Sequence, residues 1–189
     1  MLSVSVLIPA ILLAVNLVQH PIPPSAWQAA GREVRRIPPR DFKQLPPGIV
    51  SQLERMNCAI PQRWDHLPDQ PLQNVISGEF ARKGQRDWAV LCSAAGKSWI
   101  QVFWGGPEKC AARVGESDDF LQEVEPGKIG YARQIAAADE KNILHYQKEN
   151  GGPPPPRITH LGIDDGFGES GSTVRYCQRG RWLELMGGD

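Results

Sequence analysis

The chain has no excess of charge of either sign, because its 189 residues include 21 Lys plus Arg and 21 Asp plus Glu. A protein that holds nucleic acid by its phosphates needs a surplus of basic residues, so this balance argues against a nucleic-acid partner. Charged residues are 22% and hydrophobic residues 41% of the chain. Both fractions are close to those of globular proteins, which excludes a chain that is disordered throughout.

The chain also lacks the patterns that mark common catalytic and metal sites. His66, His145 and His160 are scattered, and no His-Glu-x-x-His pattern occurs. The segment 168–171 carries a serine but not the Gly-x-Ser-x-Gly spacing of a nucleophile elbow. No Cys-x-x-Cys pair is present. The sequence therefore supplies no recognisable catalytic set.

Charged residues are absent from the first thirty positions, and Leu2 to Val18 is largely apolar. We expect residues 1–20 to be a signal peptide or an N-terminal anchor, and the protein to be secreted or periplasmic. No Lys or Arg precedes the apolar run and no clean small-x-small cleavage site follows it. A buried apolar strand or helix is therefore the alternative. We expect no transmembrane segment beyond this one.

Proline-rich sequence follows the apolar segment. Residues 21–45 contain two Ile-Pro-Pro runs and show no regular apolar periodicity. Proline removes a backbone donor and biases its neighbours toward extended conformations. We therefore predict a Pro-rich linker at 21–45 and a single disulfide-stapled domain at 46–189. The linker is locally basic, so contact with an anionic membrane or cell-wall polymer is the alternative to a solvated tether.

Four cysteines, an even number, lie within the predicted domain: Cys58, Cys92, Cys110 and Cys177. In an exported chain they indicate two disulfides, for which three connectivities are possible. We predict Cys58–Cys92, which would join the first helix to the first β unit, and Cys110–Cys177, which would join that unit to the last hairpin. A metal site or a reactive thiol is the alternative.

Short apolar runs separated by glycine-containing turns fill residues 72–106, a pattern typical of an antiparallel meander. A helix is expected from near Pro46 to Asn57, where apolar residues recur at helical spacing. A second helix is expected after Asp139, which is a suitable N-cap, and a second β unit at 158–186. We predict an α+β fold, mostly antiparallel β meanders, with one helix N-terminal to the first meander and one between the two β units.

Residues 75–106 resemble one repeat of the FG-GAP/VCBS type. Gly78-Glu79-Phe80 corresponds to the Gly-Asp-Phe element of that repeat, and Asp87-Trp88-Ala89-Val90 to its Asp-Leu-Ala-Val element. The resemblance implies a β scaffold, and in the family the loop between the two elements often holds calcium. Here that loop is 81–86 and contains three cations, which oppose calcium binding. The chain as a whole resembles exported bacterial proteins of unknown function, which implies a localisation but no activity.

The segment 160–166 resembles a degraded Asp-x-Asp-Gly-Ile-x-Asp calcium loop. Asp164, Asp165 and Glu169 are its weak candidate metal ligands, and an ordinary Asp/Gly turn is the alternative. The same three carboxylates could serve a small secreted glycosidase-like hydrolase, which needs two carboxyl groups facing a cleft. No other cofactor is expected.

Six tryptophans are the remaining resource. Trp88, Trp99, Trp104 and Trp182 lie in expected strands, whereas Trp27 and Trp64 lie in irregular sequence. An exposed tryptophan can stack on a sugar ring or anchor a protein partner, although packing in the core is the alternative. Our leading expectation is a non-catalytic extracytoplasmic binding module for an unknown protein or envelope glycan. A small hydrolase and a calcium-stabilised β domain are the rivals.

Overall fold

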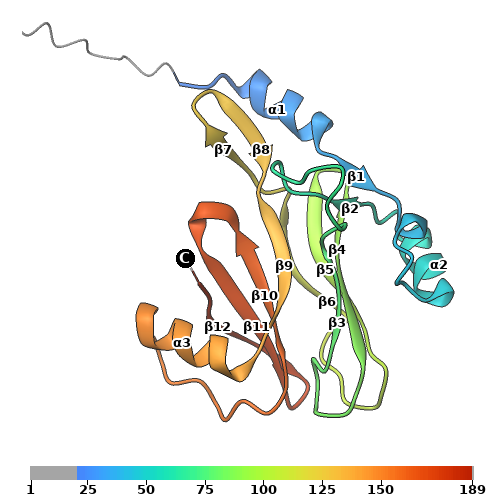
Figure 1. Ribbon diagram of the computed structural model, residues 1–189, viewed down its shortest axis with the longest axis vertical. Coiled ribbons are helices and arrows are strands. Elements are labelled where there is room, and N and C mark those ends of the chain that lie inside the picture. The colour runs from blue at the N-terminus through green and yellow to red at the C-terminus, as the bar shows by residue number, and fades with distance from the viewer. Residues whose placement is uncertain (1–20, 189) are drawn as a thin grey trace, which may run out of the picture.

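Two four-stranded antiparallel sheets form the body of the molecule, and each carries a helix on its outer face (Figure 1). The computed structural model describes residues 21–188, so the predicted signal peptide or anchor at 1–20 lies outside the described residues. In chain order the elements are α1 (Pro24–Glu33), β1 (Arg36–Ile37), η1 (Pro39–Asp41), α2 (Pro47–Arg55), β2 (Ile60–Pro61), β3 (Val75–Gly78), β4 (Asp87–Ala94), β5 (Lys97–Phe103), β6 (Arg113–Asp118), β7 (Leu121–Glu125), β8 (Lys128–Tyr131), β9 (Arg133–Ala138), α3 (Glu140–Asn150), β10 (Gly162–Phe167), η2 (Gly168–Ser170), β11 (Ser172–Gln178) and β12 (Arg181–Met186). This arrangement confirms the predicted α+β fold.

The strand orders are β3-β4-β5-β6 in the first sheet and β12-β11-β10-β9 in the second. Successive side chains of a strand point to opposite faces of its sheet. Ala89 and Leu91 of β4 therefore meet Ile163 of β10 in the core between the sheets, while Val90 and Cys92 face α2. The first sheet is covered on both faces, which explains the nearly continuous apolar sequence of β4.

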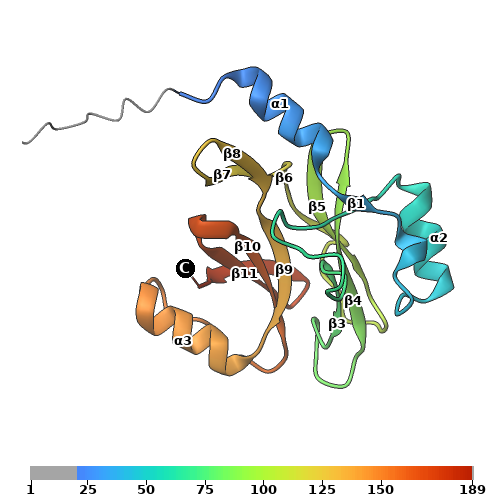
Figure 2. The ribbon, with the colours of Figure 1, turned by 45° about the horizontal axis from the view of Figure 1, so that its top comes forward.

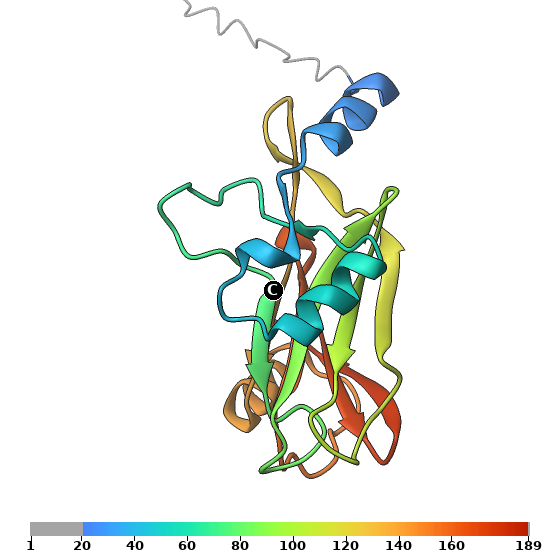
Figure 3. The same cartoon turned by 90° about the vertical axis from the view of Figure 1, so that its right-hand side faces the viewer.

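Helix α2 begins at a pair of prolines, where Pro47 occupies the first turn and needs no intrahelical N–H partner. Its Leu53 is fully buried and packs with Val90 and Cys92 on the outer face of the first sheet. Figure 3 shows α2 crossing that face at an angle to the strands. The predicted helix from Pro46 is therefore confirmed.

Helix α3 covers the outer face of the second sheet. The Asp139 carboxylate accepts a hydrogen bond from the Asn142 backbone N–H at 2.8 Å, as expected of an N-cap. Ile143 is buried against β11, whereas the next residue, Leu144, is 47% exposed. Consecutive helical residues are about 100° apart, and only one of this pair can face the sheet.

Residues 21–45 do not form the extended linker that their prolines predicted. Pro24–Glu33 is helix α1, and β1 pairs with β2. Phe42 and Leu45 are 1% and 5% exposed, and both belong to the core beneath α2. Proline is tolerated in the first helical turn, so here the prolines begin helices instead of excluding them. The folded part of the chain therefore extends N-terminal to residue 46.

The hairpin of β7 and β8 extends beyond the two sheets, and α1 lies along it (Figure 2). Arg36 fixes the end of α1 to the first sheet. Its guanidinium donates to the carbonyls of Gly31 and Val34, and it pairs with the Asp119 carboxylate at 2.7 Å. The basic residues of this segment thus include one with a specific structural partner.

Strand β5 is central, between β4 and β6. The region 110–121, which resembles a loop in sequence, contains the edge strand β6. In β6 the residues Gly115 and Glu116 form a β-bulge opposite Trp99, so the side-chain alternation is interrupted. Because of this interruption and its polar sequence, β6 shows no alternating apolar pattern from which a strand could be predicted.

Both disulfides have the predicted connectivity, Cys58–Cys92 and Cys110–Cys177, and the described residues contain no free cysteine. The first disulfide joins the segment after α2 to β4. The second joins the loop after β5 to β11 and so links the two sheets covalently. Disulfides persist in oxidising compartments, so they indicate a non-cytoplasmic protein. Between residues 21 and 188, no helix has the length and apolarity needed to cross a bilayer.

Candidate ligand-binding groove

Two adjoining concavities lie between α2 and the outer face of the first sheet, and we call them together the α2 groove. Their volumes are about 620 Å³ and 550 Å³, and they share Arg86 and Trp88. The groove is lined by Gln44, Pro46, Ile49, Gln52, Met56, Val75, Ser77, Arg86, Trp88, Gln101, Val102, Phe103, Trp104, Gly105, Gly106, Lys109 and Ala112.

One wall of the α2 groove is the helix itself. Ile49, Gln52 and Met56 are three and four residues apart, so they share one side of α2. Leu53, on the neighbouring side, holds the helix against the core. Met56 is 37% exposed and lies at the rim of the groove. The helix therefore supplies both an apolar and an amide contact.

The floor of the groove comes from β4 and β5. Gln101 and Phe103 of β5 lie on the same face as Trp88 of β4, because Trp88 and Phe103 are directly paired across the two strands. Gln101 is 9% exposed, and its amide makes only a 3.5 Å contact to the Val102 carbonyl, at the outer limit of a hydrogen bond. The floor thus combines aromatic faces with a weakly engaged amide.

The end of the groove is held by the buried carboxylate of Asp87, which is 0% exposed. One of its oxygens accepts from the backbone N–H groups of Phe80 and Ala81, at 3.1 and 3.2 Å. The other accepts from the Gln85 side-chain amide at 2.8 Å and from the Gly105 N–H at 2.9 Å. Asp87 therefore joins the loop before β4 to the segment after β5.

Two glycines allow these segments to approach closely. A Cβ atom on Gly105 would lie 2.0 Å from the carbonyl oxygen of Arg86, and one on Gly106 would lie 2.3 Å from the Gln85 amide oxygen. Real Cβ atoms do not approach a backbone carbonyl so closely, so position 105 requires glycine, whereas a side chain at position 106 would have to displace the Gln85 side chain. The close approach places Arg86 at the junction of the two concavities.

The charges along the α2 groove are all positive. Arg86 and Lys109 are the charged residues of its lining, both are exposed, and no Asp or Glu belongs to it. Among residues 21–188, no ion pair involves Arg86 or Lys109, so neither charge is neutralised by a carboxylate of the protein. The groove therefore favours an anionic ligand.

The predicted site residue Asp165 lies elsewhere, in the interior between the sheets. Its carboxylate pairs with Arg133 through contacts of 2.8 and 3.0 Å and with Arg175 at 3.0 Å, and both Asp165 and Arg133 are 0% exposed. Arg133 also donates to the Ser98 carbonyl of β5 at 3.1 Å and to the Gly115 carbonyl of β6. We call Arg133, Asp165 and Arg175 the ion cluster, and it connects the two sheets.

The other two predicted site residues, Asp164 and Glu169, do not form a common site with Asp165. Asp164 precedes it on β10 and therefore points to the opposite face of the sheet, where burial, together with the charge of Asp165, raises the pKa of Asp164. Glu169 lies in η2 and is exposed. A hydrolase of the glycosidase type needs two carboxyl groups facing one cleft, and these three residues do not form that arrangement.

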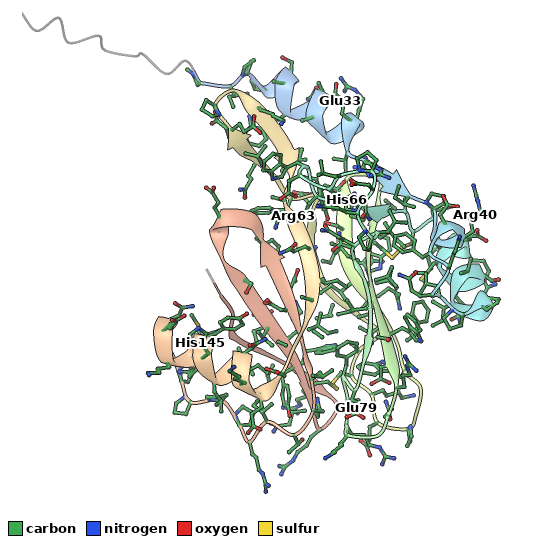
Figure 4. The ribbon with its side chains drawn as sticks, in the orientation of Figure 1. Glu33, Arg40, Arg63, His66, Glu79 and His145 are labelled. Atoms are coloured by element: carbon green, nitrogen blue, oxygen red, sulfur yellow. A yellow bond between two sulfur atoms is a disulfide. The ribbon has the colours of Figure 1, made fainter. Side chains whose placement is uncertain are left out.

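Two of the scattered histidines, His66 and His145, lie in different parts of the molecule (Figure 4). His66 is buried near Arg63 at the junction below α1, where its Nδ1 accepts from Arg35 at 3.1 Å. His145 lies on α3 beside Glu149, and His160 stacks on Tyr176 with a centroid distance of 4.2 Å. Across residues 21–188, no three His, Cys, Asp or Glu side chains are placed to share a metal ion.

Some tryptophans occupy other positions in the structure than the sequence predicts. Trp99 is 4% exposed and belongs to the core, as expected of a strand residue. Trp88 and Trp104 are only partly buried and line the groove, although they also lie at the edges of the core. Trp27 lies in α1 and not in irregular sequence. Strand position alone could not separate groove tryptophans from core ones.

The fold and the groove define a class of protein: a disulfide-linked α+β protein of two facing antiparallel sheets, with an aromatic and cation-lined groove beneath a short helix. No family model matches the chain, and no curated protein or solved structure shows significant similarity to it. The resemblance of residues 75–106 to an FG-GAP/VCBS repeat stays a prediction.

Proposed function

We propose that this protein is a non-catalytic extracytoplasmic binding module whose ligand, a protein or an envelope glycan, occupies the α2 groove. The observation that carries the proposal is the lining of the groove, which offers aromatic faces, amide groups and cations but no carboxylate. Binding sites are usually concave and largely apolar, with a few polar groups that fix the orientation of the ligand. General acid–base hydrolysis would need carboxylates or histidines that this groove lacks.

Rigidity supports a binding role. The disulfide Cys58–Cys92 joins the segment that follows α2 to β4, and Asp87 fixes the loops at the other end of the groove. A site held by such connections loses little conformational entropy when a ligand binds. The groove therefore has the preformed character that recognition favours.

The experiment measures binding of envelope oligosaccharides and of synthetic peptides by tryptophan fluorescence. We expect Trp88→Ala to weaken binding at least about tenfold, since an aromatic anchor in a groove typically contributes more than 1 kcal/mol. Trp64→Ala is the matched control, because Trp64 is 37% exposed and lies outside the groove. Since Trp88 also contacts the core, Met56→Ala on the exposed rim tests the same surface without affecting packing beneath it.

If neither Trp88→Ala nor Met56→Ala changes the binding affinity, the ligand binds outside the α2 groove and the proposal is refuted. Mass spectrometry of the recovered oligosaccharides provides the second readout. Cleavage products that disappear in an Asp164→Asn or Glu169→Gln variant would show catalysis and support the hydrolase instead.

A further inference from the structure

We infer that the ligand of the α2 groove is a saccharide that carries carboxylate groups, such as a uronic-acid polymer; this inference rests on the proposed function and specifies its ligand class. Three kinds of groups carry it, and they occur together along the groove: aromatic faces, side-chain amides and cations.

The aromatic groups match the apolar faces of sugar rings. Trp88 is shared by the two concavities, and Phe103, its direct cross-strand partner, extends the aromatic surface along β5. Tryptophan presents a flat apolar face with a polar edge. The C–H groups on one face of a pyranose can pack against such a face. A row of aromatic residues therefore suits successive sugar units.

The amides match the hydroxyl groups of a saccharide. Gln44, Gln52 and Gln101 each offer one carbonyl acceptor and one amide donor, so a single side chain can satisfy a hydroxyl in both directions. Gln101 is the innermost of the three and has only one weak contact within the described residues. A ligand hydroxyl would complete its hydrogen bonding.

The cations specify that the saccharide is acidic. Arg86 and Lys109 lie along the same groove, and no carboxylate of residues 21–188 forms an ion pair with either. Arginine can bind a carboxylate through two parallel hydrogen bonds, and such charge-assisted bonds are the strong ones. Ligand carboxylates could pair with both cations, because no carboxylate belongs to the lining of the groove.

An acidic peptide fits the groove less well. The floor is a sheet face, and the backbone groups of Gln101 and Val102 are already paired with β4 and with the strand segment before β6. An extended peptide is usually recognised by main-chain hydrogen bonds to a free strand edge. Of the strands that line the groove, β3 lies at the edge of the sheet, whereas β4 and β5 present side chains and no free edge, so a saccharide makes better use of most of the floor.

The test is isothermal titration of the full chain with a hexamer of galacturonic acid, its methyl-esterified counterpart, and hexaglutamate. We expect the acid hexamer to bind at least about tenfold more tightly than the ester, in which methylation removes the charge. Arg86→Gln should weaken acid-hexamer binding about tenfold, and Arg86→Lys should restore part of it. Arg82→Gln is the matched control, because Arg82 is exposed on the same loop but does not line the groove.

Each outcome decides the question. Equal binding of acid and ester hexamers, with dependence on Trp88, would overturn the acidic ligand while leaving the binding function intact. Hexaglutamate that binds as tightly as the acid hexamer would overturn the saccharide in favour of an acidic peptide. Failure of all three probes would overturn the inference, and the binding function would then depend on the separate panel of envelope oligosaccharides and peptides.

Discussion

Gly115 offers the sharpest test of how the two sheets are held together. It occupies the bulge of β6 with φ of +64°, and a Cβ atom there would lie 2.8 Å from Nη2 of Arg133 and 2.9 Å from both Nε of Arg175 and Oδ2 of Asp165. Gly115→Ala therefore forces a methyl group into the ion cluster. We expect the free energy of unfolding to fall by about 3 kcal/mol, from backbone strain and overpacking combined.

Thermal unfolding followed by circular dichroism measures this effect. For a chain of this size, about 3 kcal/mol corresponds to a decrease in Tm of about 6–12 °C. Gly127→Ala is the control, because Gly127 has a similar φ of +76° but no atom lies within 4 Å of the position that a Cβ would take there. It should cost only about 1 kcal/mol, the strain of a left-handed alanine. If both variants lower Tm equally, the side chains of the ion cluster can move to accommodate the methyl group. That result would refute the prediction that close packing around Gly115 makes this substitution more costly.

Two further predictions concern single carboxylates. Asp87→Asn replaces one carboxylate oxygen, which accepts two hydrogen bonds, by an NH2 group that can only donate. Buried N–H groups such as those of Phe80 or Gly105 then lose their acceptor. The free energy of unfolding should fall by about 2–4 kcal/mol. Faster hydrogen exchange at these amides would show it, and unchanged exchange would contradict it. Burial raises the pKa of Asp164 in the folded protein, so the folded state favours the protonated carboxyl group. The stability that this group contributes is therefore fully present below its unfolded-state pKa, and it is lost as the pH rises through the raised, folded-state pKa. Asp164→Asn should therefore be more stable than the wild type at about pH 7 and equal to it at about pH 3, and a gain that persists in acid would argue against burial as the cause.

The parts of the fold that sequence reasoning predicted are those encoded locally. The apolar run of β4, the glycine-containing turns and the Asp139 N-cap each act within a few residues, and the structure confirms all three. The disulfide pairing was predicted from the order of the expected elements, since each bridge joins the end of one to the body of another. Local patterns and chain order were sufficient for these features.

The remaining features depend on contacts between distant residues. Arg133 meets partners 32 and 35 residues away, so nothing near it in sequence marks it as the largest fully buried side chain. The fold of residues 21–45 depends on burial of Phe42 and Leu45 under α2, which outweighs the extended preference of the prolines. The α2 groove likewise combines a helix, three strands and several loops. No local pattern marked it, because Trp88 was grouped with the tryptophans of the expected strands.

The two disulfides also determine the order in which the chain can be oxidised. Cys58 and Cys92 are 34 residues apart, whereas Cys110 must wait for Cys177, 67 residues further along. A chain that emerges N-terminus first therefore holds three thiols before the fourth is made. The pairing of Ala59 with Ser93, through backbone bonds of 2.8 and 3.2 Å, aligns Cys58 with Cys92 and removes both from exchange with Cys110. In the folded chain this β pairing leaves Cys110 with Cys177 as its partner.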